Sequence, residues 1–430
     1  MRHAHPDVLA NVNWDRVLAA YANSLNRVSS HDELLDLMQE MQGELGASHA
    51  GVSPPDVDVD EEARQGFLGG WFEWDGEDGG WRVVRMLEGA AWDEASAPPL
   101  GRACVGARVG SVLLAINQIR LTPMTPPEVA LRRLARREVF ITLRDPATSG
   151  DDRSRGGGRR ARRGGPKARV VRVRVAGAPL LRRAIYLDWV ARSRACVRAV
   201  AARCSDAEGA VGYVHVADME EGGYEDFTRQ YLAEVRSGCR ALIVDLRGNA
   251  GGATSDLLLA RLSQRRAGVE LPAHGAASAV PEHAPPSHLI IIIDELTSSD
   301  AELLAHELVR MTGALAIGAR TWGGVYGVGK TTLIDGTTVA HPEYALRLHG
   351  GGRGGAASHI ENHGVVPEVA VEVTPLDVAR GHDAQLVEAA ERAAALAAAA
   401  QLAARADDVE EQEGDGRAGG RARIKHWSMR

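Results

Sequence analysis

The sequence contains little lysine, few aromatic residues and few cysteines. Lysine accounts for only three of the 50 basic residues (Lys167, Lys330 and Lys425), and aromatic residues make up 4% of the chain. Both shortages are typical of a GC-rich genome, whose codons favour Arg, Ala and Gly. The four cysteines lie far apart with no CxxC pair, which favours reduced thiols in a cytosol over a disulfide framework.

Long apolar runs are also missing. No run approaches the ~18 apolar residues of a membrane span, and the N-terminus lacks the apolar core of a signal peptide. The formal net charge of −7 argues against a general nucleic-acid binder. We therefore expect a cytoplasmic protein with no membrane and no nucleic-acid partner. Its 430 residues predict two or three globular domains.

The pattern of apolar and polar residues divides the chain into five segments. Residues 1–50 carry apolar side chains at helical spacing, and residues 51–147 form short strands with glycine turns. Residues 148–169 are a Gly/Arg segment, interpreted as a flexible linker rather than an RNA-binding segment. Residues 170–400 alternate apolar strands with helices, starting from the strand VVRVRV. Residues 401–430 are charged and predicted to be disordered.

Two of these segments indicate a fold class. The runs ALIVDL (241–246) and LIIIID (289–294) are continuously apolar, which predicts strands covered on both faces by helices, an α/β domain. The strand-rich segment 51–147 has one late helix after a G-x-x-L-x-x-I-N turn and resembles a PDZ domain. PDZ domains bind extended peptides along a sheet edge.

Two loops that follow apolar strands are candidate sites. The loop from Asp245 to Gly252 has paired glycines that let backbone N–H groups approach a ligand, although a plain left-handed turn would look the same. The segment from Asp294 to Glu302 turns from a strand into a helix, which would present a serine beside N–H donors. The alternative is a capping box with Ser298 or Ser299 as the N-cap.

A third candidate is Ser48-His49, because a serine nucleophile needs a base and histidine is the usual one near neutral pH. Two other patterns are rejected. Gly324 to Thr331 fits the P-loop pattern, but a β-branched segment follows where a P-loop needs a helix. His359 and His363 lie four apart, but the flanking Gly and Pro residues argue against the helix that a zinc site of this spacing needs. We expect no metal and no cofactor.

Seven stretches, taken together, resemble the tricorn protease family of serine peptidases, which is related to the C-terminal processing peptidases. They are GELGASHA (43–50), VGYVHVADM (211–219), ALIVDLRGNAGG (241–252), DELTSSDAE (294–302), ARTWGGVYG (319–327), LIDGTTVAHPEYAL (333–346) and IENHGVVPEV (360–369). The resemblance covers the catalytic half of such a protease, without its β-propellers. It implies a crotonase-like α/β catalytic core, an inserted PDZ-like β-rich domain and an N-terminal helical segment.

The resemblance also implies roles for individual residues. Ser299 aligns with the nucleophile and His49 with the general base, while Ser48 and Glu361 align with the residues that orient and polarise that base. The backbone N–H groups of Gly252 and Asp300 align with the oxyanion hole. Two further residues, Gly251 and Glu270, are expected to contact substrate.

Glu270 aligns with an acidic residue that selects basic side chains before the cleaved bond. The resemblance therefore implies cleavage after Arg or Lys in peptides or unfolded proteins. In the family this residue can act on a neighbouring subunit, and the family assembly is a hexamer, so a homo-oligomer is expected.

The lysine shortage discriminates between two mechanisms. C-terminal processing peptidases use a Ser/Lys dyad whose lysine lies in a T-F-G-K segment. The equivalent segment here runs from Thr321 to Gly324, with glycine in place of the lysine. A histidine-based tetrad is therefore favoured over C-terminal processing chemistry. A catalytically idle PDZ scaffold stays open as a second alternative.

Overall fold

The computed structural model describes residues 12–55, 64–89, 96–146, 167–204, 209–274, 278–345 and 360–418, with side chains up to residue 402. The chain forms two compact units, residues 1–56 with 193–430 and residues 57–192. Most of the expected linker (148–166) and the end of the expected tail (419–430) lie outside the described residues. Among the described helices, none is both long enough and apolar enough to cross a membrane.

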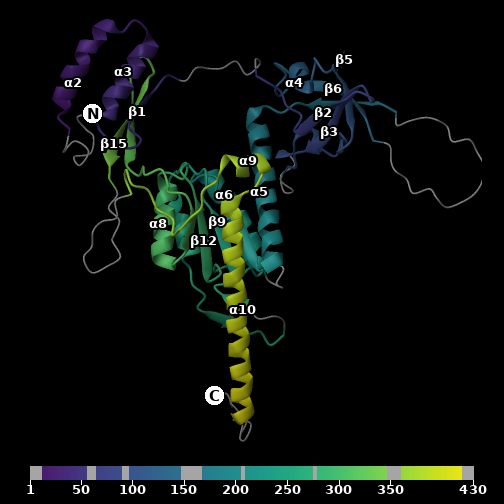
Figure 1. Cartoon of the computed structure of the whole chain (residues 1–430), viewed down its shortest axis with the longest axis vertical. Coiled ribbons are helices and arrows are strands. Elements are labelled where there is room, and N and C mark those ends of the chain that lie inside the picture. Colours follow the sequence, from purple (N-terminus) through teal and green to yellow (C-terminus); the bar gives the residue numbers. More distant parts are fainter. Residues whose placement is uncertain are drawn as a thin grey trace, which may run out of the picture. The chain divides into compact units, whose positions relative to one another are not determined.

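A five-stranded sheet forms the centre of the first unit (Figure 1). Its strand order is β16-β13-β12-β9-β8, and every pairing is parallel. The strands are β8 (Val211–His215), β9 (Ala241–Asp245), β12 (His288–Ile293), β13 (Leu315–Gly318) and β16 (Val369–Ala370). Because all residues of β8 and β9 are buried, the predicted α/β domain with a covered sheet is confirmed.

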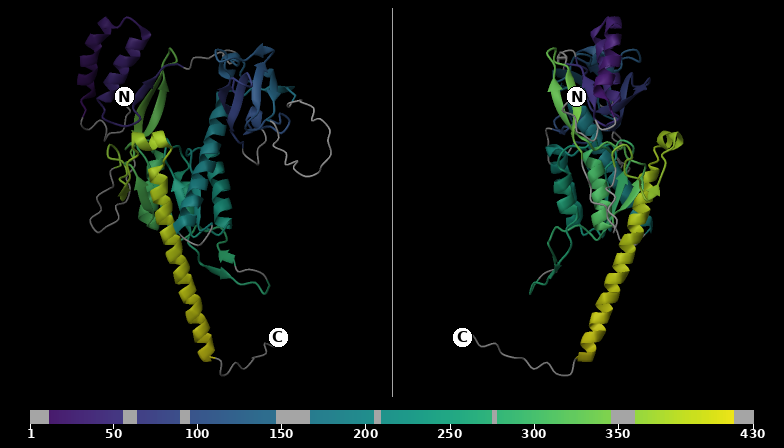
Figure 2. Two further views of the ribbon diagram at one scale, coloured as in Figure 1. Left: turned by 45° about the vertical axis from the view of Figure 1, so that its right-hand side comes forward. Right: turned by 90° about the vertical axis from the view of Figure 1, so that its left-hand side faces the viewer.

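Helices cover both faces of this sheet. They are α6 (Glu221–Arg236), α7 (Ser255–Leu262), α8 (Asp300–Thr312) and α10 (Ala384–Ala418). The short helix α9 (Pro375–Arg380) precedes α10 and has no buried residue. Alternate residues of β12, Leu289, Ile291 and Ile293, share a core with α8. The intervening isoleucines face the other way, toward α10, which crosses β9 and β12 (Figure 2). Helix α10 reaches Ala418, so the prediction of disorder from residue 401 is wrong as far as that residue.

The N-terminal segment is helical, as predicted. It contains α2 (Trp14–Ala22), a 3₁₀ turn (Asn23–Arg27) and α3 (His31–Gly43), with Ser30 capping α3. Strand β1 (Gly51–Ser53) then pairs with β15 (Thr338–Tyr344), which pairs with β14 (Gly327–Thr332). The sequence analysis assigned residues 51–53 to the PDZ-like segment. Their hydrogen bonds place them in the first unit instead.

The second unit is built on an antiparallel sheet with the order β2-β3-β4-β6-β7. Its elements are β2 (Gly70–Asp75), β3 (Gly80–Met86), a 3₁₀ turn (Pro99–Gly101), β4 (Val112–Ile116), β5 (Ile119–Arg120), α4 (Pro127–Ala130), β6 (Glu138–Arg144) and β7 (Arg169–Arg174). Strands β2 and β3 pair as an antiparallel hairpin, in agreement with the short strands and glycine turns predicted for this segment. Strand β7, expected to begin the α/β domain, pairs with β6 and belongs to this sheet. Helix α5 (Ala178–Cys204) follows it.

Candidate active site

The two loops singled out in the sequence meet at the carboxyl edge of the parallel sheet. One follows β9 and the other follows β12, its direct neighbour. The backbone N–H of Ser298 donates to the carbonyl of Asn249 at 2.9 Å. A Cβ on Gly251 would lie only 2.6 Å from the Cβ of Ser299. The glycine is therefore needed for the loops to touch, which a plain turn would not require.

Ser299 occupies the first position before α8 with a φ of 57° and a ψ of −125°. An ordinary N-cap residue is extended, whereas this conformation is rare for a residue with a side chain. The carboxylate of Glu302 accepts the Ser299 N–H at 3.0 Å, which is one half of the capping box expected as the alternative, whereas the side chain of Ser299 makes no capping hydrogen bond. The two interpretations coexist, because the strained turn presents a serine that the cap holds in place.

Two backbone N–H groups beside Ser299 are available to a ligand. Among the hydrogen bonds of the described residues, the N–H groups of Gly252 and Asp300 have no acceptor. The N–H of Asp300 belongs to the first turn of α8 and has no partner within the helix. The carboxylate of Asp300 is fixed by the N–H of Ser255 at 2.9 Å. These two donors are the pair expected for an oxyanion hole.

A buried ion-pair network stabilises the start of the glycine loop, where it leaves β9. Arg247 binds the fully buried Asp245 at 2.7 Å and Asp383 at 2.8 Å. The hydroxyl of Tyr213 donates to Asp245 at 2.8 Å. Burial alone would raise the pKa of Asp245, but the charge and hydrogen bonds of Arg247 outweigh it and lower this pKa. The loop therefore begins from a rigid, charged anchor.

The candidate base is assembled from opposite ends of the chain. Ser48 Oγ lies 3.0 Å from His49 Nδ1 and donates to Glu361 Oε2 at 2.9 Å. The Ser48 N–H donates to the other carboxylate oxygen at 2.7 Å. Because the single hydroxyl proton of Ser48 goes to Glu361, the proton in the contact with His49 must lie on Nδ1. That tautomer leaves Nε2 of His49 free to accept a proton.

Glu361 is anchored by more than Ser48. Its Oε2 also accepts the N–H groups of Val325 at 2.8 Å and Tyr326 at 3.2 Å. The glycine-rich segment before it (350–358) lies outside the described residues. Four donors nevertheless fix this carboxylate from the side of Ser48 and of Val325.

Burial and neighbouring carboxylates have opposite effects on His49. Its half-buried position lowers the pKa of the imidazole below the usual value, and the charges of Glu361 and Glu302 only partly oppose this. Trp322 contributes to the enclosure, with its ring centroid 4.9 Å from that of His49 at 75°. A neutral imidazole is the form that can act as a base.

We expect His49 to titrate below its usual value of about 6.5. The measurement is an NMR pH titration of the histidine resonances, with the His49 signal assigned by its loss in His49→Gln. A midpoint at or above the usual value would contradict the burial seen here.

Comparisons with known proteins agree with this architecture. Three family models match: the tricorn protease C1 domain over residues 7–43, the tricorn protease PDZ domain over 66–155 and peptidase family S41 over 210–371. The chain belongs to the tricorn protease family. Its second unit accordingly contains the PDZ domain.

Relatives and a solved structure extend this match. Tricorn protease homolog 1 of Streptomyces coelicolor is 36% identical over 88% of this chain and 32% of its own. The tricorn protease homolog of Saccharolobus solfataricus is 31% identical over 89% and 32%. The crystal structure of the tricorn protease superposes with a TM-score of 0.74 at 26% identity, covering 89% of this chain and 34% of that one. The chain thus spans about a third of the length of these relatives.

Most residues expected from the tricorn family resemblance fall into two groups. Ser48, His49 and Glu361 form one hydrogen-bonded group. The other contains Gly251, Gly252, Ser299 and Asp300. The segment from Thr321 to Tyr326 joins them, since Trp322 donates its N–H to Thr297 and a Cβ on Gly324 would lie 2.8 Å from that of Ser48. Among the described contacts, no hydrogen bond links His49 to Ser299.

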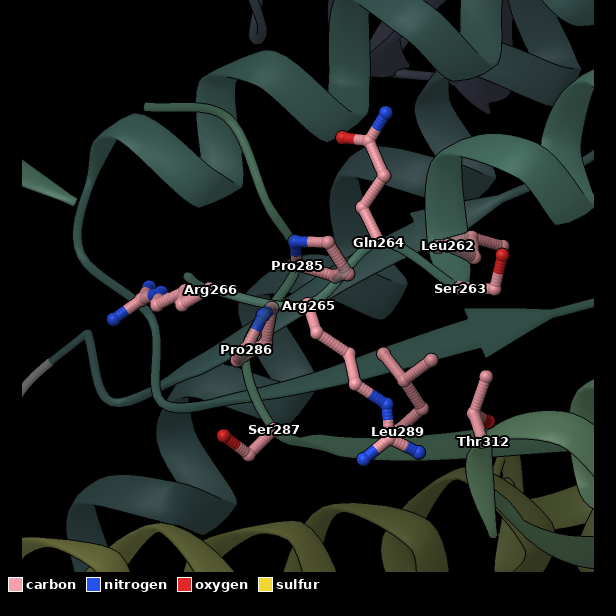
Figure 3. Close-up of a pocket in the computed structure, with 10 residues that line it drawn as sticks. All are labelled: Leu262, Ser263, Gln264, Arg265, Arg266, Pro285, Pro286, Ser287, Leu289 and Thr312. Atoms are coloured by element: carbon pink, nitrogen blue, oxygen red, sulfur yellow. The ribbon is translucent and has the colours of Figure 1, made fainter. Parts of the chain in front are cut away.

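Glu270 is not brought to this site within one chain. It ends β10 (Gly268–Glu270), an exposed strand paired with β11 (Ser278–Val280). Helix α7 carries the chain away from Gly252 before this hairpin begins. A cavity of about 260 Å³ beside it is lined from Leu262 to Arg266, from Pro285 to Ser287, and by Leu289 and Thr312 (Figure 3). Leu289 lies near the start of β12, and Ser299 follows its end.

Of the two rejected motifs, the structure describes the P-loop-like segment and only part of the histidine pair. Residues 327–331 of the P-loop-like segment lie in strand β14, with β15 after it and no helix. His363 lies in a turn, and His359 lies outside the described residues. Within the described part of the chain, no group of three His, Cys, Asp or Glu side chains could hold a metal ion.

Sequence reasoning missed two residues of the site. Trp322 contacts His49, and Glu302 is fully buried beneath Ser299. Glu302 had been assigned only to the capping box. The signal available for Trp322 was its place in the segment where the related peptidases carry their lysine.

Proposed function

We propose that the chain is a serine endopeptidase that hydrolyses bonds in peptides or unfolded proteins. One observation carries the proposal: Glu361, Ser48 and His49 form a hydrogen-bonded relay between residues 313 positions apart. A PDZ scaffold without catalysis would not need this relay. A Ser/Lys mechanism is not favoured, because Gly324 stands at the lysine position and packs against Trp322.

In the proposed mechanism, Ser299 Oγ attacks the substrate carbonyl while His49 Nε2 takes its proton. Negative charge develops on the carbonyl oxygen and is stabilised by the N–H groups of Gly252 and Asp300, each worth ~3 kcal/mol. Glu361, acting through Ser48, stabilises the imidazolium. His49 then protonates the leaving amine, and water hydrolyses the acyl-enzyme by the same route. The residues handle every proton and charge, so the mechanism calls for no cofactor.

A fluorophosphonate probe tests the function directly, because it reacts only with an activated serine. We expect the folded chain to be labelled once and to cleave internally quenched peptides. A folded chain that takes up no label would favour the idle scaffold. Peptides with free and amidated C-termini should be cleaved alike, whereas a C-terminal processing peptidase would prefer the free carboxylate.

We also propose that the protein works as a homo-oligomer, by family resemblance a hexamer, in which Glu270 serves a neighbouring subunit. The exposure of Glu270, at the edge opposite Ser299, supports a role in another copy rather than its own. Its carboxylate would pair with an Arg or Lys side chain before the cleaved bond.

We expect Glu270→Gln to reduce the preference for Arg over Leu by about tenfold, the value of one hydrogen bond to a charged group. The measurement compares kcat/KM on fluorogenic peptides ending in Arg and in Leu. Glu282→Gln, an exposed glutamate close by in the sequence, is the matched control. An unchanged Arg preference in the assembled protein would refute the assignment.

Two broader expectations belong with this proposal. We propose that the core is of the crotonase-like type, supported by the parallel strands with helices on both faces. We also propose that the protein acts in the cytoplasm, in agreement with the spacing of its cysteines.

A further inference from the structure

Glu302 is a fully buried carboxylate without a cationic partner. It lies in the first turn of α8, and its exposed fraction is 0%. Within the described residues, no salt bridge joins it to Lys, Arg or His. A buried charge of this kind is costly unless hydrogen-bond donors replace water. The identity of those donors therefore shows what the residue holds together.

Four donors converge on this carboxylate. Oε2 accepts the backbone N–H groups of Ser299 at 3.0 Å and Gly324 at 2.9 Å. Oε1 accepts the hydroxyl of Thr321 at 2.5 Å and the N–H of Gly323 at 2.8 Å. A capping box accounts for the Ser299 contact alone. The other three donors come from a segment some twenty positions downstream.

The segment that Glu302 binds also contains the residues that pack against Ser48 and His49. A Cβ on Gly324 would lie 2.8 Å from Ser48 Cβ, and the ring of Trp322 stands edge-on to that of His49. The next two residues, Val325 and Tyr326, donate their N–H groups to Glu361. Residues 321–326 are thus held by two carboxylates, one reaching the nucleophile and the other reaching the serine that orients the base.

We propose that Glu302 is a positioning residue that fixes Ser299 and the segment 321–324 in register with Ser48 and His49. The effect expected on kcat and on the pH profile rests on the proposed peptidase function. Glu302 does not touch substrate. It determines whether the nucleophile and base, which come from separate parts of the chain, stay aligned. Misplacement by about 1 Å is enough to reduce a rate by about 100-fold.

The test variant is Glu302→Gln, because an amide keeps the shape but places an NH₂ group against N–H donors. We expect kcat to fall about 100-fold with KM little changed. The charged groups that act on His49 are Glu361, from the turn after residue 360, and Glu302, from α8. Removing the Glu302 charge should therefore also move the acid limb of kcat/KM to lower pH. Glu307→Gln, on the same helix and paired with Arg310, is the control.

A second measurement does not depend on activity. Hydrogen exchange followed by mass spectrometry should show faster exchange, by about tenfold or more, at Gly323 and Gly324 in Glu302→Gln but not in Glu307→Gln. Unchanged exchange would overturn the inference whether or not the protein is a peptidase. If Glu302→Gln had the same kcat and the same acid limb of kcat/KM as the wild type, the inference about Glu302 would be overturned and the proposed function would stand. Absence of labelling in the wild type would reject the peptidase function. The exchange result would still decide whether Glu302 holds the segment 321–324 in place.

If Glu302→Gln does not fold, two less disruptive variants of Thr321 can be compared. Thr321→Val removes one donor to Glu302 and also the acceptor of the Val365 N–H, whereas Thr321→Ser keeps the hydroxyl. We expect faster exchange and lower kcat in Thr321→Val, with recovery in Thr321→Ser. Equal behaviour of the two variants would overturn the proposal.

Discussion

Replacing Ser299 with alanine should lower kcat/KM by about a million-fold, because the proposed reaction has no other nucleophile. Labelling by a fluorophosphonate should disappear completely. Folding should be preserved, since the contacts of Ser299 described above are made by its backbone N–H and by its Cβ beside Gly251. A thermal unfolding midpoint close to that of the wild type would show that the loss is chemical.

Ser298→Ala is the matched control for this variant. Ser298 precedes the proposed nucleophile in the same turn, and its backbone N–H binds the glycine loop. Its hydroxyl has no role in the mechanism, so labelling and turnover should persist. If Ser298→Ala were inactive and Ser299→Ala active, the nucleophile would be wrongly assigned by one position.

The second large effect is expected from His49→Ala. Loss of the base should reduce kcat/KM nearly as much as loss of the serine, because the two act as a unit. The double variant Ser299→Ala/His49→Ala should therefore be no worse than either single variant. As the pH increases, the wild-type kcat/KM should rise with a midpoint below about pH 6.5. Burial lowers the pKa of His49, and only the neutral ring can accept the proton.

His31→Ala is the control for the base. His31 is exposed at the start of α3, and its one ion pair with a described residue is a loose one with Asp335 at 3.8 Å, so its removal should leave kcat unchanged. Independent, multiplying losses in the double variant would contradict a shared step. They would mean that His49 supports the fold around Ser48 rather than taking the proton from Ser299.

Much of the fold could be predicted from the sequence because local patterns specified it. The continuous apolar runs of β9 and β12 gave buried parallel strands, and helical spacing gave α2 and α3. The errors concern strands whose partners are distant. Neither β1 nor β7 shows in its own residues whether it will pair with β15 or with β6. Pairing depends on which edge is free in three dimensions.

The candidate site divides in the same way. The sequence alone determined the residue types and their order: a glycine loop after β9, a serine before α8, Ser48-His49, and no lysine at position 324. Those features depend on local chemistry, so they can be recognised in a linear chain. The family resemblance then assigned their expected roles.

Only the tertiary structure decided how these residues are held. It joined Ser48 to Glu361 across 313 positions and buried Glu302 under the segment from Thr321 to Gly324. It also placed Glu270 on an exposed strand after α7, away from Ser299. Hydrogen bonds between distant segments form only when folding has removed water and aligned donors with acceptors. No pattern of neighbouring residues encodes that alignment, and it is this alignment that would let separate segments act as one site.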